Sequence, residues 1–188
     1  LIADRGGFYH EPKVGIHDRV GELDFTSLYP MLMLKKNLSA ETVRCKCCPD
    51  STKRVPELDY NICEKRKGIV PKSIELLLKK RAKYKELEGR ASDPSLRSLY
   101  EKRRAALKWI LVCAFGYLGF KNARFGKIDA HIATCAFARQ TLLTATRLAE
   151  ERGFELVHGI VDSLWLKKSD ATENDFIELR DEICRETE

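Results

Sequence analysis

The middle of the sequence predicts two long helices joined by a short loop. Pro71 suits the first turn of a helix that extends to about residue 88, because proline lacks only a backbone donor that is unpaired at that position anyway. Residues 89–92 interrupt this pattern, and Asp93 followed by Pro94 predicts the capped start of a second helix that ends near residue 115. Two helices with such a short connection form an antiparallel hairpin, which divides the rest of the chain into two parts.

Each of these two parts has an acidic residue associated with an apolar strand pattern. Residues 20–25 predict a strand with Asp24 at its end, followed by a sharp turn into Ser-Leu-Tyr-Pro. Residues 154–168 predict two strands around Gly159, and Asp162 belongs to the second. Two further helices are expected at residues 130–152 and 172–188. The pattern indicates an α+β fold, in which helices back a small antiparallel sheet and an antiparallel helical hairpin projects from it.

Length and charge limit the classes of function. The 188 residues suffice for one domain or two small ones, and with 44% hydrophobic residues the chain can bury a core. The net charge of +6 suits a polyanionic partner, and basic residues cluster at 79–81 and 102–104 in the two predicted helices. Such runs are also common on solvated helix faces. No apolar run approaches the roughly 20 residues of a membrane span, so no membrane partner is expected.

The two acids and the basic hairpin between them indicate a phosphoryl-transfer site with two metal ions. Asp24 and Asp162 are the candidate ligands, because hard divalent cations prefer carboxylate oxygens. The structural alternative is a pair of capping or solvent-facing acids. A metal-dependent nuclease fits less well, because the sequence lacks the larger cluster of acids that an editing site needs.

Three segments together resemble the motifs of family B DNA polymerases. Residues 24–30 resemble motif A, residues 108–116 motif B and residues 158–165 motif C, with matching order and spacing across nearly the whole chain. The resemblance implies a palm and fingers fragment of a longer polymerase, without the exonuclease and thumb regions. The implied divisions are a first part of the palm with motif A and a cysteine-containing loop at 1–68, the fingers helical hairpin at 69–118, and a second part of the palm with motif C at 119–188.

The resemblance also implies roles for individual residues. Asp24 and Asp162 would be the catalytic acids and, with the carbonyl group of Phe25, would hold two Mg²⁺ or Mn²⁺ ions. Tyr29 would be a steric gate whose ring fills the space that a ribose 2′-hydroxyl needs. The implied nucleotide-binding residues are Phe25, Ser27, Leu28, Tyr29, Arg81, Lys85, Lys108 and Val112, and the residues against the nascent base pair are Phe115 and Gly116.

Motifs B and C depart from the family pattern within the site. Motif C usually carries two acids on one face of a strand, two residues apart, and Ile160 stands in place of the first. In motif B, Val112, Cys113 and Phe115 replace the usual asparagine, serine and tyrosine. These changes resemble a divergent archaeal branch of the family. They predict template-directed DNA synthesis that is attenuated or specialised.

A catalytically degenerate paralogue that acts as a DNA-binding or replication scaffold is the alternative. Six retained residues favour chemistry instead: Asp24, Tyr29, Arg81, Lys85, Lys108 and Asp162. The expected partners are primer–template DNA, dNTP and the missing exonuclease and thumb regions of the parent polymerase. The expected location is the cytoplasm, in association with the nucleoid.

Four of the seven cysteines cluster in a region without regular structure, at positions 45, 47, 48 and 63. Cys45, Cys47, Cys48 and Cys63 could form a disulfide, bind a structural zinc ion or remain free thiols. The pattern is Cys-x-Cys-Cys followed by one cysteine 15 residues later, not two regular Cys-x-x-Cys pairs, so it indicates zinc only weakly. Some archaeal relatives carry a disulfide in this part of the palm, which favours the disulfide. The other three cysteines, Cys113, Cys135 and Cys184, are expected to pack as small hydrophobic residues.

Overall fold

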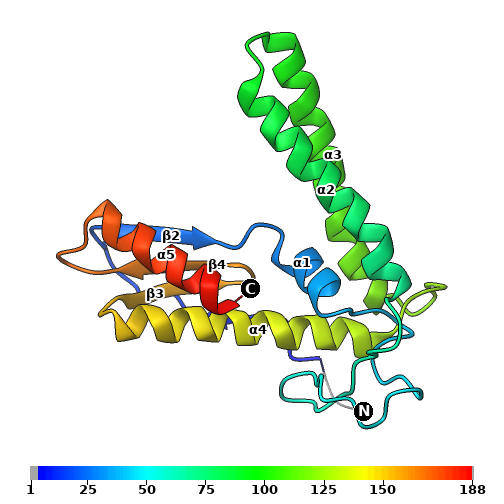
Figure 1. Cartoon of the computed structure of the whole chain (residues 1–188). Helices are drawn as coiled ribbons and strands as arrows, with labels where there is room; N and C mark the ends of the chain where they lie inside the picture. The colour runs from blue at the N-terminus through cyan, green and yellow to red at the C-terminus, as the bar shows by residue number, and fades with distance from the viewer. Residues whose placement is uncertain (1–3, 188) are drawn as a thin grey trace. The chain divides into compact units, whose positions relative to one another are not determined.

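The computed structural model describes residues 4–187 and divides the chain into two compact units (Figure 1). Residues up to Leu28 form the first unit together with those from Cys135 onward, and Tyr29–Thr134 forms the second. The first contains the sheet and the two acids, and the second contains the helical hairpin and the cysteine-rich loop.

A four-stranded antiparallel sheet forms the centre of the first unit, with strand order β1–β3–β4–β2. The strands are β1 (Tyr9–His10), β2 (Val20–Asp24), β3 (Glu155–Ile160) and β4 (Ser163–Lys167). β3 and β4 form a hairpin in which Ile160 lies opposite Ser163. On the far side of β4, Asp24 also lies opposite Ser163. The end of β2 is therefore level with the hairpin turn.

Two helices supply most of the remaining core of this unit. α5 (Glu173–Thr187) crosses the sheet in Figure 1, and it buries Leu179 and Ile183. Its Phe176 lies so close to β2 that a Cβ added at Gly21 would stand 2.4 Å from the ring, which explains the absence of a side chain there. From Cys135 onward, α4 (Ile128–Glu151) buries a row of small side chains that permits close packing: Ala136, Ala138, Ala145 and Ala149.

The second unit contains the predicted helical hairpin. α2 (Ile69–Arg90) has Pro71 in its first turn, and α3 (Pro94–Gly119) begins after Asp93, whose side chain accepts a hydrogen bond from the backbone N–H of Ser95 at 2.9 Å. Stacking of Tyr84 on Tyr100, with ring centroids 6.1 Å apart, fixes the register of the two helices. α1 (Leu28–Lys35) precedes the loop and buries Leu32 and Met33.

The α+β fold and the small antiparallel sheet expected from the sequence are confirmed. The position of the β3–β4 turn was predicted wrongly: the chain reverses at Val161 and Asp162, and Gly159 lies inside β3. Asp162 is therefore a turn residue, so strand alternation does not place it on the same face as Ile160. Cys113 and Cys184 are exposed, contrary to expectation, whereas Cys135 is buried.

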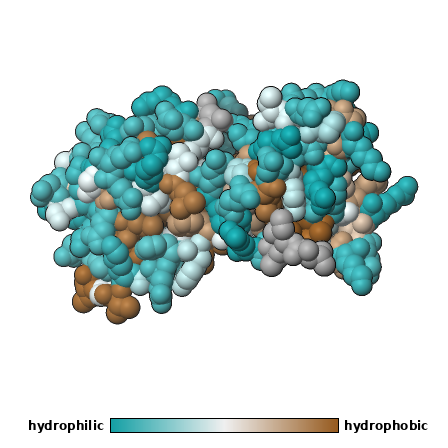
Figure 2. All heavy atoms as spheres, turned by 90° about the horizontal axis from the view of Figure 1, so that it is seen from below, coloured by the Kyte–Doolittle hydropathy of each residue, from teal (hydrophilic) through white to brown (hydrophobic). Residues whose placement is uncertain are grey.

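The surface is consistent with the composition. Hydrophilic residues predominate on the face seen in Figure 2, and the apolar residues there form separate groups. None of the helices in residues 4–187 combines the length and the apolar character that crossing a membrane requires.

Candidate active site

The chain segments that carry Asp24 and Asp162 lie next to each other at one end of the sheet. The Ser163 hydroxyl, next to Asp162 in sequence, donates a hydrogen bond to Asp24 Oδ1 at 3.1 Å. The backbone N–H of Phe25, next to Asp24, donates to the carbonyl oxygen of Asp162 at 2.9 Å. These reciprocal contacts join the end of β2, which carries Asp24, to the β3–β4 turn, which carries Asp162. Asp24 is exposed and Asp162 is half-buried.

The turn that carries Asp162 has an unusual backbone. Val161 has φ of +56°, in the left-handed region that β-branched residues rarely adopt. Its N–H donates to the carbonyl oxygen of Phe8 at 2.9 Å, which holds the turn against the N-terminal segment. A Cβ at Gly159 would stand 2.5 Å from the Phe8 ring, so glycine is required for this close approach. Phe8 therefore supports the turn at two points, and no sequence signal had marked it.

Ile160, the residue just before this turn, ends β3 with 39% of its surface exposed. An exposed isoleucine beside two acids supplies no charge and no ligand oxygen. The side of the site where the resemblance predicts another carboxylate is therefore apolar.

The turn after Asp24 contains one backbone hydrogen bond of its own and one residue in the left-handed region. The N–H of Leu28 donates to the carbonyl oxygen of Phe25 at 3.3 Å, and Ser27 has φ of +57°. The Leu28 side chain is only 5% exposed, so a contact of this residue with a nucleotide would use its backbone.

In the second unit, Tyr29 and Phe115 lie side by side. Their ring centroids are 4.6 Å apart at an interplanar angle of 56°. Phe115 also stacks on His131, with centroids 4.3 Å apart and planes at 18°, and His131 Nδ1 donates to the Phe115 carbonyl oxygen at 3.3 Å. The three rings form a continuous aromatic group. His131 was missed from the sequence, because nothing in the pattern of α4 indicates a partner on α3.

The basic residues of the hairpin differ in their surroundings. Arg81 and Lys85 are four residues apart on α2 and share one of its faces, and Lys108 is on α3. Within residues 4–187, neither Lys85 nor Lys108 forms an ion pair, and both are exposed. Arg104, in contrast, is bound to Glu88 by two hydrogen bonds of 2.6 and 3.3 Å. It is therefore a structural residue of the hairpin.

The chain matches the family model described as DNA polymerase family B over residues 4–182. It belongs to this family. Among curated family B relatives, DNA polymerase 2 of Saccharolobus solfataricus is 39% identical over 167 residues, which are 89% of this chain and 24% of that protein. The DNA polymerase of Archaeoglobus fulgidus is 30% identical over 182 residues, 96% of this chain and 23% of that protein.

A solved family B structure supports the same conclusion. The family B DNA polymerase of Pyrobaculum calidifontis superposes with a TM-score of 0.75 and 32% sequence identity. The match covers 95% of this chain and 24% of that one. The chain thus spans about a quarter of the length of the family B polymerases that it matches.

Within the family B framework, the altered part of motif B lies on an open helix face. Val112 is 50% exposed, Cys113 is exposed, and a Cβ at Gly116 would meet nothing within 4 Å. This face is accessible, but Val112 offers no hydrogen-bonding side chain. The apolar side chains that the sequence shows in motif B therefore lie on an accessible face of α3.

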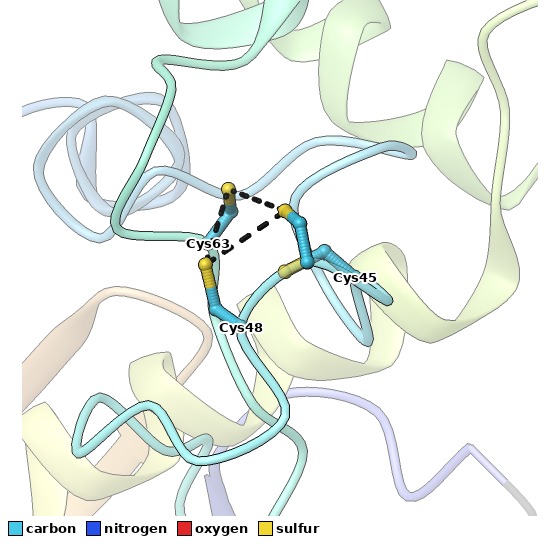
Figure 3. Close-up of side chains that lie close together, drawn as sticks. Cys45, Cys48 and Cys63 are labelled. Atoms are coloured by element: carbon cyan, nitrogen blue, oxygen red, sulfur yellow. Dashed lines mark hydrogen bonds between the residues drawn. The ribbon is translucent and has the colours of Figure 1, made fainter.

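The four clustered cysteines converge in the second unit (Figure 3). Every cysteine of the described chain is a free thiol, so the expected disulfide is not formed. Burial raises the pKa of the Cys63 thiol, but the backbone N–H groups of Lys65 and Arg66 together with the Cys47 and Cys45 thiols lower this pKa to about 7. The hydrogen bond with Cys63 raises the pKa of Cys47 to about 12.

Proposed function

We propose that this chain is the palm and fingers region of a DNA polymerase that transfers a nucleotidyl group from dNTP to the 3′-hydroxyl of a primer. The observation that carries the proposal is that the segments bearing Asp24 and Asp162 are joined at one end of the sheet. Family membership supports the same activity. The divisions at 1–68, 69–118 and 119–188 are proposed as palm, fingers and palm.

The donor set at the acids suits hard divalent cations. Two carboxylates and the Phe25 carbonyl group are oxygen ligands of the kind that Mg²⁺ and Mn²⁺ prefer. When bound, two such ions would lower the pKa of the primer hydroxyl and neutralise charge on the triphosphate. The Ser163 hydroxyl orients the Asp24 carboxylate, and the Phe25–Asp162 backbone contact holds the two segments together.

The hairpin and Tyr29 would bind the nucleotide. Arg81, Lys85 and Lys108 are the proposed contacts to the triphosphate, through a planar guanidinium fork and two ammonium groups. Tyr29 would lie under the sugar, and Phe115 with Gly116 would face the nascent base pair. Ser27, Leu28 and Val112 would complete the nucleotide contacts. Primer–template DNA and the exonuclease and thumb regions of a longer protein are the proposed partners.

The activity would be attenuated or specialised. Ile160 removes a charge beside the acids, and Val112 cannot hydrogen-bond to a substrate. A small loss in transition-state stabilisation is expected from these changes, since Asp24 and Asp162 themselves are retained.

Primer extension by the full-length protein in Mg²⁺ and in Mn²⁺ tests this function. Asp24→Asn and Asp162→Asn should each abolish extension while primer–template affinity, measured by fluorescence anisotropy, is kept. Asp170→Asn, at an exposed acid outside the site, is the matched control and should extend normally. DNA binding without extension by the unaltered protein in either metal would instead support the scaffold alternative.

A further inference from the structure

The cysteine-rich loop brings four sulfur atoms from two segments together. Cys45, Cys47 and Cys48 follow Val43, and Cys63 follows Ile62; Val43 and Ile62 pair in an isolated antiparallel bridge. The four Sγ atoms all lie within 4.8 Å of one another, and Figure 3 shows the side chains converging.

The sulfur–sulfur distances fit tetrahedral coordination of one ion. The Cys47–Cys63, Cys47–Cys48 and Cys48–Cys63 distances are 3.6, 3.7 and 3.9 Å. A tetrahedron with zinc–sulfur bonds of about 2.3 Å has edges of about 3.8 Å. A disulfide needs sulfurs about 2.05 Å apart and would join them only in pairs. An iron–sulfur cluster spreads its four cysteines over two or four irons, so all four sulfurs would not lie within 4.8 Å of one another.

Hydrogen-bond donors surround these sulfurs. The side-chain N–H₂ of Asn61 lies 3.6 Å from Cys45 Sγ and donates to the carbonyl oxygens of Cys45 at 2.9 Å and Cys48 at 2.7 Å. The backbone N–H groups of Lys65 and Arg66 contribute to lowering the pKa of the Cys63 thiol. Donors of this kind stabilise thiolates and orient them toward a metal.

The local charge and exposure also suit a metal–thiolate group. Four thiolates with one divalent ion carry a net charge of −2, and residues 44–67 contain seven lysines and arginines against four acids. Cys45 and Cys63 are buried, whereas Cys47 is exposed and leaves a route for an ion.

We propose that Cys45, Cys47, Cys48 and Cys63 together bind one zinc ion in a structural tetrathiolate site. The site would stabilise the start of the fingers hairpin. Asn37 donates to the carbonyl oxygens of Cys63 at 3.0 Å and Arg66 at 2.9 Å, and accepts from the N–H of Gly68, the N-cap of α2, at 2.8 Å. The segment that leaves the cysteines is thereby tied to the N-cap of the helix. The proposal does not depend on polymerase activity.

Metal analysis of the full-length protein by inductively coupled plasma mass spectrometry tests it. Protein purified under reducing conditions from zinc-supplemented cells should contain one zinc ion per site. Cys48→Ser and Cys63→Ser should each lose most of this zinc, whereas Cys113→Ser and Cys184→Ser, at exposed cysteines outside the cluster, should keep it. Replacement of zinc by Co²⁺ should give the thiolate charge-transfer and intense visible bands of a tetrahedral sulfur site.

Measurements on the unaltered protein test the proposal independently of whether any variant folds. Its zinc should be removable by a strong chelator, with a lower midpoint of thermal unfolding that added Zn²⁺ restores. Reactive thiols without metal, a disulfide detected by mass spectrometry of the non-reduced protein, or iron with acid-labile sulfide would each overturn it.

Discussion

The aromatic rings of Tyr29 and Phe115 contact each other at a centroid distance of 4.6 Å. The residue proposed to exclude ribonucleotides therefore rests on a residue of the altered motif B. Phe115 is itself held by His131. A substitution at Phe115 should therefore shift the Tyr29 ring and so alter the binding of the nucleotide.

Tyr29→Ala should admit ribonucleotides, because it removes the ring that competes with a 2′-hydroxyl. The ratio of kcat/KM for dNTP to that for the matching rNTP should fall by at least about tenfold, a change of roughly 1.4 kcal/mol in discrimination. Phe115→Ala should cause a smaller fall, since it removes a ring contact of about 0.5–1.5 kcal/mol and leaves the gate in place. Tyr29→Phe keeps the ring and is the control. If Tyr29→Ala discriminated between dNTP and rNTP as well as the parent does, Tyr29 would be a packing residue and not a steric gate.

Ile160→Asp should increase the rate of primer extension. The change restores a carboxylate beside Asp24 and Asp162, with an expected gain of about 1–2 kcal/mol in the barrier, or roughly tenfold in kcat. Ile160→Val keeps the apolar character and should not differ from the parent. If the aspartate variant folds and binds primer–template but gains no activity, the attenuation has another source.

Arg81→Ala and Lys108→Ala should raise the KM for dNTP, because each removes a charge-assisted contact to the triphosphate. An increase of about tenfold is expected for each, with little change in primer–template affinity. Lys83→Ala is the matched control, because residue 83 lies on a different face of α2 from Arg81 and Lys85. If these variants lost primer–template affinity while the KM for dNTP stayed constant, this face of the hairpin would bind DNA and not the triphosphate.

Gly159→Ala should destabilise the first unit. The added Cβ would stand 2.5 Å from the Phe8 ring, and such overpacking costs about 1–3 kcal/mol. Chemical denaturation should show the loss, and Phe8→Leu should recover part of it in the double variant. Gly116→Ala, where a Cβ meets nothing within 4 Å, should show no such loss. Equal stability of the Gly159 variant and the parent would show that Phe8 can move aside.

Features determined by neighbouring residues were predicted best from the sequence. Pro71, Asp93 and Pro94 act within one helical turn, so the helical hairpin and the starts of its helices were recognisable. The end of the second helix was not, because α3 continues through Gly116 to Gly119 and does not end near residue 115. The β3–β4 turn was assigned to Gly159 because glycine commonly marks turns. Its actual role depends on Phe8, a residue remote in sequence, while the turn uses a valine that local preferences disfavour.

In the candidate site, too, features set by local sequence were predicted better than features set by the packing of remote residues. Recognisable motifs indicated that the segments of Asp24 and Asp162 belong together, although Asp162 lies in the β3–β4 turn and not in a strand. The aromatic group and the sulfur cluster depend on how separate segments pack. His131 contacts Phe115 from another helix, and Cys63 reaches Cys47 across a loop without regular structure. No local pattern encodes either contact.

The contact between Asp24 and Ser163 spans 139 residues of sequence, which has a consequence for folding during synthesis. The α2–α3 hairpin makes its contacts locally and can form soon after its own residues leave the ribosome. The two acids cannot meet until β4 has also emerged. A nascent chain that stops before Ser163 could therefore contain the helices proposed to bind nucleotide, but it would lack the paired acids. Assembly of the catalytic end of the sheet should be a late event in the folding of this protein.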